Sequence, residues 1–120
     1  MGCAAALATL AETKRLNVAA NAAVRGAELQ TGLQALQAKH QVVGDARGVG
    51  LMGCLELVGD RETKAPADAS VVATVSDRCY DSGVIVRASG NNVIISPPLI
   101  VTEADVTRII TALDGALAAG

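Results

Sequence analysis

Helical patterning dominates the first third of the chain. The first forty residues contain no proline and are rich in Ala, Leu, Gln, Glu and Lys, which are strong helix formers. Within them Leu29, Leu33 and Leu36 recur at helical spacing and form one apolar stripe. Two asparagines interrupt this composition without forming a turn signal. We therefore expect either one long helix or two helices with a bend near residues 16–18.

The segment from Ala4 to Ala11 is apolar nearly all round. A helix of this kind has to be covered on more than one side, and a chain of this size has little material with which to cover it. We expect its apolar surface to favour self-association, so that the protein forms a homodimer or a larger homo-oligomer.

The pattern changes between Val42 and Val58, where the helical period disappears. Alternate positions, from Val49 through Leu51 and Leu55 to Leu57, form one set and those from Gly50 to Val58 the other, which suits a strand with one face well buried and the other partly buried. Glycines in this segment indicate bulges or a close approach of backbones. Residues 47–50, Arg-Gly-Val-Gly, form only a weak candidate for a phosphate-binding loop because no helix follows them.

Two more helices are expected in the second half of the chain. Residues 59–69 are polar, contain a proline and indicate a loop. Apolar residues then recur at helical spacing as far as Gly83, where a glycine typically ends a helix. Thr102 precedes a segment with acids in its first turn and indicates the capped start of the last helix. The expected buried stripe of that helix comprises Val106, Ile109, Ile110, Leu113 and Leu117.

Between these helices the sequence predicts a hairpin. Residues 84–86, Val-Ile-Val, favour one strand, residues 90–92, Gly-Asn-Asn, favour a turn, and residues 93–95 favour the returning strand. Pro97 and Pro98 cannot donate to a ladder, so pairing should stop there. Arg87 would then lie at the end of a strand, beside a turn. Its planar guanidinium suits a carboxylate or a phosphate, and the alternative is a surface arginine paired with a local acid.

The order of expected elements is helix, helix, strand, strand, helix, strand, strand, helix. Short connections between the strands favour a two-layer α+β sandwich with a mainly antiparallel sheet and helices on one face. Its 120 residues are enough for a single domain, residues 1–120. With no Phe, no Trp and one Tyr, the core has to be built from small aliphatic side chains.

Charge and cysteine content exclude several classes of protein. The net charge is −2 and basic residues are scattered singly, which argues against DNA or RNA as a partner. No apolar run is long enough to span a membrane and no charged leader precedes the first apolar segment, so we expect a soluble cytoplasmic protein. Cys3, Cys54 and Cys79 suit reduced, buried thiols. With His40 as the one histidine and no Cys-x-x-Cys pair, we expect no metal site.

Two motifs resemble a known family. RGVGLMGCLELV (residues 47–58) and GVIVRASGNNVIISPPLIVTEADV (residues 83–106) are similar to the C-terminal small domain of class III aminotransferases of the ω-transaminase type. The opening CAAALATL also resembles the start of the helix that leaves the large domain in that family. The resemblance covers essentially the whole chain. It implies the small domain of the fold type I aminotransferases, which packs beside a large domain that carries pyridoxal 5′-phosphate.

The resemblance also implies a role for Arg87. In the ω-transaminase branch, an arginine in an R-x-x-G segment ahead of S-P-P-L is a mobile side chain that binds the substrate carboxylate, and residues 87–90 match that segment. Asn91 departs from the Asp of many relatives, keeping the hydrogen-bonding shape and losing a charge.

The residues that amino transfer needs are missing from this stretch of sequence. A Schiff-base lysine, an acid for the pyridinium nitrogen and a phosphate cup are expected in the absent large domain. Lys14, Lys39 and Lys64 are interpreted as solvated side chains. We therefore expect no catalytic or cofactor-binding residue here, and a fragment or remnant of an aminotransferase that is inactive alone. The alternatives are a stand-alone oligomerisation or interaction module and a domain that binds small anions through Arg87.

Overall fold

A computed structural model describes residues 1–118 of the chain. The elements in chain order are α1 (Gly2–Arg15), α2 (Val18–Lys39), β1 (Val43–Val49), β2 (Met52–Leu57), α3 (Ala69–Asp81), β3 (Arg87–Ser89), β4 (Asn92–Ile95) and α4 (Glu103–Ala118). The predicted order of helices and strands, and the α+β class, are confirmed. No helix in residues 1–118 has the length and apolar content that crossing a membrane requires.

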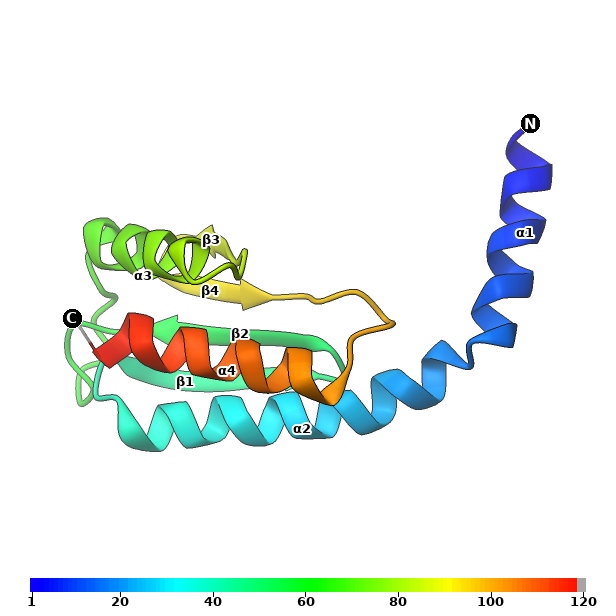
Figure 1. Ribbon diagram of the computed structural model, residues 1–120. Coiled ribbons are helices and arrows are strands. Elements are labelled where there is room, and N and C mark those ends of the chain that lie inside the picture. The colour runs from blue at the N-terminus through cyan, green and yellow to red at the C-terminus, as the bar shows by residue number, and fades with distance from the viewer. Residues whose placement is uncertain (119–120) are drawn as a thin grey trace.

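The four strands form one antiparallel sheet in the order β1-β2-β4-β3. Side chains alternate across it, so that Leu55 and Val93 are fully buried while Cys54 and Ile94 on the opposite face are only partly covered. Helix α2 packs on β1 and β2, α3 packs on β3 and β4, and α4 packs against α2 and α3 (Figure 1). The core between helices and sheet is made of Leu, Val, Ile, Ala and Cys side chains, as the composition predicts.

Small residues let α2 approach the β1–β2 hairpin very closely. A Cβ atom added at Gly26 of α2 would lie 2.5 Å from the backbone carbon of Gly50 in the hairpin. No side chain can be accommodated at that distance, so the predicted close approach of backbones is confirmed here. The predicted stripe of Leu29, Leu33 and Leu36 is buried directly beyond this contact.

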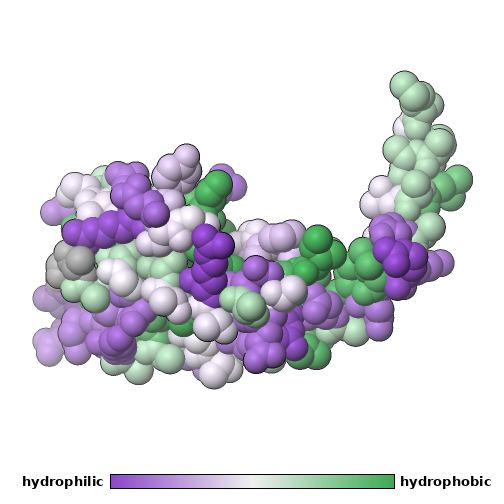
Figure 2. All heavy atoms as spheres, in the orientation of Figure 1, coloured by the Kyte–Doolittle hydropathy of each residue, from purple (hydrophilic) through white to green (hydrophobic). Residues whose placement is uncertain are grey.

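Helix α1 projects away from the rest of the molecule. Asn17 adopts a left-handed conformation, with φ of 48°, and separates α1 from α2, which settles the choice between one helix and two. No residue of α1 is buried, and its largely apolar surface stands clear of the other elements (Figures 1 and 2). The radius of gyration is 16.0 Å, whereas a compact domain of this length has about 14 Å.

The exposure of α1 corrects the expectation for the cysteines. Cys79 on α3 is fully buried, Cys54 on β2 is partly covered, and Cys3 on α1 is exposed. The expectation that all three thiols are buried is therefore wrong for Cys3, because nothing within residues 1–118 packs over α1. All three are free thiols, as predicted.

The first strand of the predicted hairpin is displaced along the chain. Val84 and Val86 are buried, but residues 84–86 pair with no strand, and β3 begins at Arg87. The backbone N–H of Val84 donates to the carbonyl of Cys79 at 2.8 Å and so closes the end of α3. Arg87 therefore begins a strand and does not end one. The returning strand stops at Ile95, before Pro97, as predicted.

The predicted helix ends are confirmed. Helix α3 ends two residues before Gly83, whose φ of 77° lies in the left-handed region that favours glycine. At the start of α4 the backbone N–H of Asp105 donates to Oγ1 of Thr102 at 3.3 Å, and the backbone N–H of Thr102 donates to the Asp105 carboxylate at 2.9 Å. Thr102 thus caps α4 in a reciprocal arrangement.

An ionic cluster joins the end of α2 to α4. Nζ of Lys39 lies 2.7 Å from Oδ2 of Asp114, and Nε2 of His40 lies 2.6 Å from Oδ1. The hydrogen bonds from Lys39 and then His40 hold the pKa of Asp114 below its usual value of 3.8. His40 is the one buried polar residue of the described chain, and its bond to Asp114 adds a polar link to the apolar contact between α2 and α4.

Replacing Asp114 by Asn tests this cluster. A carboxyl group whose pKa is lower in the folded state stabilises the fold at pH values above its unfolded pKa and loses that effect as the pH falls through the folded value. The variant should lose up to about 1 kcal/mol of unfolding free energy near neutral pH, and the difference from the native chain should shrink as the pH falls below about 4.

Urea titrations between pH 2 and 7 measure this difference. Asp77→Asn is the control, because the Asp77 carboxylate makes no hydrogen bond or ion pair with residues 1–118; equal losses in both variants would contradict the account.

Candidate functional site

The face of the sheet that the helices leave open carries the candidate site. Arg47 pairs with Cys54, Cys54 with Ile94, and Ile94 with Arg87 in the registers of the adjacent strands. Residues directly opposite each other in antiparallel strands share a face. The sheet therefore places Arg87 on the open face, at the end of a row that crosses all four strands and has Arg47 at its other end.

Arg87 is exposed and unpaired. Within residues 1–118 its side chain makes no hydrogen bond and no ion pair. The interpretation of Arg87 as a surface arginine held by a local acid therefore does not describe this structure. A guanidinium without a partner can bind a planar anion in a forked arrangement.

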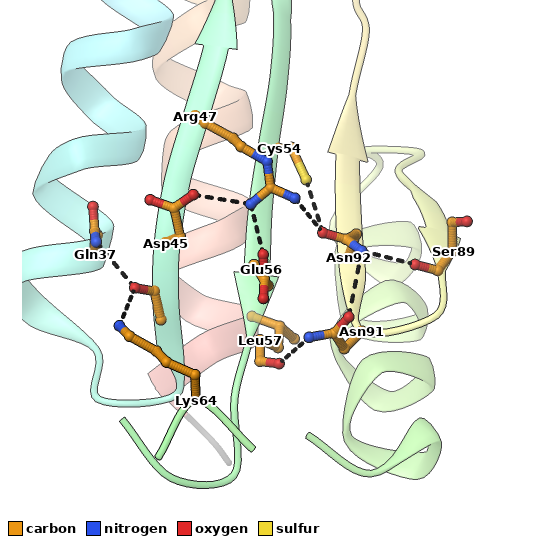
Figure 3. Close-up of polar contacts among 11 residues, drawn as sticks. Gln37, Asp45, Arg47, Cys54, Glu56, Leu57, Lys64, Ser89, Asn91 and Asn92 are labelled. Atoms are coloured by element: carbon orange, nitrogen blue, oxygen red, sulfur yellow. Dashed lines mark hydrogen bonds and ion pairs between the residues drawn. The ribbon is translucent and has the colours of Figure 1, made fainter. Parts of the chain in front are cut away.

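Arg47, in contrast, is paired with acids. Its Nη1 donates to the carboxylates of Asp45, at 2.9 Å, and Glu56, at 2.7 Å, and its Nη2 donates to Oδ1 of Asn92 at 2.9 Å (Figure 3). The hydrogen bonds to Asp45 and Glu56 raise the pKa of Arg47 above its usual range. The weak suggestion of a phosphate-binding loop at residues 47–50 does not fit, because Arg47 already holds two carboxylates and its segment is the end of a strand.

Two asparagines hold the turn that follows Arg87, Asn91 by bonding to strand β2 and Asn92 by bonding to the end of β3. The side-chain amide of Asn91 donates to the carbonyl of Leu57 at 2.9 Å, and the backbone N–H of Leu57 donates to the carbonyl of Asn91 at 2.7 Å. The amide of Asn92 donates to the carbonyl of Ser89 at 3.3 Å. Asn91 thus tethers the turn through a donor that an Asp carboxylate at this position does not have.

A shallow groove of about 450 Å³ runs along this face. Its lining is mainly apolar, from Val49, Met52 and Ile94, with Arg47 and Asn92 at its polar edge. The thiol of Cys54 in the groove donates to Oδ1 of Asn92 at 3.3 Å, and its partial burial raises the pKa of that thiol. Such a surface can hold a small molecule with an apolar body and a polar end.

Sequence reasoning singled out Arg87 and did not predict the polar cluster around Arg47 on the same face. Asp45, Arg47, Glu56 and Asn92 meet on the open face although they come from three strands. The sequence feature that could have indicated the pair of Asp45 and Arg47 is their spacing of two residues in a strand, which places both side chains on one face. Only the strand order could add Asn92 to this cluster.

None of the three lysines fits a pyridoxal phosphate site. Lys14 lies on the exposed helix α1, Lys39 is paired with Asp114, and Nζ of Lys64 donates to the carbonyl of Gly44 at 3.2 Å. Lys64 is exposed, which agrees with its interpretation as a solvated side chain, and makes this one hydrogen bond to the backbone. No lysine of residues 1–118 lies at the groove, and no cluster of three His, Cys, Asp or Glu side chains in that range could hold a metal ion.

Comparison with known proteins decides the family. The family model for class III aminotransferases matches residues 1–117. The chain belongs to this family. It is 37% identical over 122 aligned residues to a taurine–pyruvate aminotransferase of Bilophila wadsworthia, with 96% of this chain and 27% of the relative covered. It is also 34% identical to ethanolamine-phosphate phospho-lyase homolog 1 of Caenorhabditis elegans, with 98% and 26% covered.

A solved transaminase structure has the same fold. An amine transaminase from an uncultivated Pseudomonas species, in its PLP-bound form, superposes with a TM-score of 0.93 at 41% identity, covering 98% of this chain and 27% of that one. The chain thus spans about a quarter of the length of the class III aminotransferases it matches.

Proposed function

We propose that this chain forms the C-terminal small domain of a class III aminotransferase of the ω-transaminase type, arranged as a two-layer sandwich. The complete protein would transfer an amino group between an amine or ω-amino acid and a keto acid, with Arg87 binding the substrate carboxylate. The observation that carries the proposal is that Arg87 stands exposed and unpaired on the open sheet face of a chain that belongs to this family.

The geometry of the hairpin suits this role. Arg87 lies in a three-residue edge strand, so its long side chain is unhindered on the outer side. The hydrogen bonds of Asn91 and Asn92 hold the turn behind it and fix the strand from which the guanidinium extends. A mobile side chain on a fixed backbone can bind a carboxylate and withdraw when the substrate has none.

Pyridoxal 5′-phosphate would be bound elsewhere in the complete protein. The Pseudomonas relative was solved with this cofactor, but the residues described here do not fit it, so no step is assigned to them through the cofactor. We propose that the 120 residues alone are inactive in amino transfer. We also propose a cytoplasmic location, which three free thiols suit.

Carboxylate binding by Arg87 is tested by calorimetry of the 120-residue chain with succinate. The Arg87→Ala variant should bind succinate at least about tenfold more weakly, because a charge-assisted forked hydrogen bond is lost. Arg15→Ala is the matched control, since Arg15 lies on α1 and is already paired with Glu12. Identical heats for the native chain and Arg87→Ala would remove the proposed role.

The second candidate function is self-association through α1. Leu7 and Leu10 are 69% and 59% exposed on a helix without any buried residue. Exposed apolar surface of this extent favours burial against another copy of the chain.

We predict a homodimer or larger species in sedimentation at high protein concentration. Leu7→Glu combined with Leu10→Glu should shift the protein toward monomer, because charges would have to be buried at the interface. Thr13→Glu, an exposed polar position on the same helix, should have little effect. A clean monomer of the native chain would exclude this candidate.

A further inference from the structure

The open face of the sheet holds two arginines in very different states. Arg47 binds both Asp45 and Glu56, whereas Arg87 pairs with no acid of residues 1–118. Both carboxylates are partly accessible, with side-chain exposures of 50% and 32%. The face thus contains two carboxylates that could themselves be ligands of Arg87.

Glu56 is the nearer of these competitors. It is opposite Asn92, which is opposite Ser89, two residues along β3 from Arg87. Strand spacings place the Cα atoms of Glu56 and Arg87 roughly 12 Å apart on the same face. Only side chains of β4 lie between them on that face, and two long side chains that extend toward each other can bridge such a separation.

We propose that Arg47 is a specificity-determining residue that keeps Arg87 available for a carboxylate from outside the chain. By holding Asp45 and Glu56, it prevents them from acting as internal substitutes for the ligand. Through Nη2 it also fixes Asn92, whose amide supports the strand of Arg87. The inference rests on the proposed function of Arg87, and Arg47 acts through Arg87 without touching the ligand.

The arrangement of charge supports this assignment. The Arg47 guanidinium donates to two carboxylates and to the side-chain oxygen of Asn92. Removing Arg47 therefore leaves Asp45 and Glu56 without their cation, on a face where Arg87 is an unpaired arginine. A cluster of this kind holds its members better than an isolated exposed pair does, because one ordered side chain serves several partners. Without Arg47, Arg87 is the unpaired arginine on the same sheet face, and Glu56 is the acid that lies nearer to it.

The first test needs no ligand. In the Arg47→Met variant the Nε–H signal of Arg87 in NMR spectra should shift and exchange more slowly with water, because Arg87 turns to Glu56. Adding Asp45→Asn and Glu56→Gln to this variant should return the signal to its native position. An Arg87 signal unchanged in Arg47→Met would overturn the inference. If Arg47→Met does not fold, Arg47→Gln carries the same prediction.

The second test measures succinate binding in the same variants. Arg47→Met should weaken binding roughly two- to fivefold, the range expected for competition by an exposed ion pair, and the triple variant should recover native affinity. A purely structural role of Arg47 predicts no recovery, since the triple variant still lacks the guanidinium; that outcome would also overturn the inference. If Arg87→Ala binds as the native chain does, the proposed function fails, and the NMR signal still decides whether Arg47 keeps Arg87 free.

Discussion

The register between β2 and β4 is the constraint on which the rest of this structure depends. It places Leu55 opposite Val93 on the covered face and Glu56 opposite Asn92 on the open face. A slip by one residue would bring the charged side chains under α2 and α3 and expose the core. The same register therefore determines both the apolar core and the polar cluster around Arg47.

The two faces of the sheet are stabilised by different interactions. On the covered face, small residues allow close contact, as at Gly26 and Gly50, and a core without Phe or Trp is packed by short aliphatic side chains. On the open face, the hydrogen bonds of Arg47, Asn91 and Asn92 join three strands and the turn behind Arg87. Arg87 is the exception on this face, since it is carried by a well-held hairpin and is itself unpaired.

Most of the helices and strands could be predicted from the sequence, because the sequence patterns that determine them are local. Leucines at helical spacing, the cap at Thr102 and the proline after β4 act within a few residues. The prediction of a strand at residues 84–86 was wrong. Val84 and Val86 are apolar because they pack into the core, and the N–H of Val84 bonds to the end of α3 and not to a strand. Likewise, Cys3 looked buried because its neighbours are apolar, but burial depends on a covering element that the helix pattern does not reveal. The resemblance singled out Arg87, but the cluster around Arg47 required the order of the strands.

We propose a division of labour in which this chain provides carboxylate recognition through Arg87 and the amino-transfer chemistry lies elsewhere in the complete protein. The most direct test is to mix the 120-residue chain with pyridoxal 5′-phosphate, an amine donor and pyruvate. The account predicts no stoichiometric visible absorption band and no alanine. A stoichiometric band that disappears on substitution of one of Lys14, Lys39 or Lys64, together with alanine formation, would contradict it.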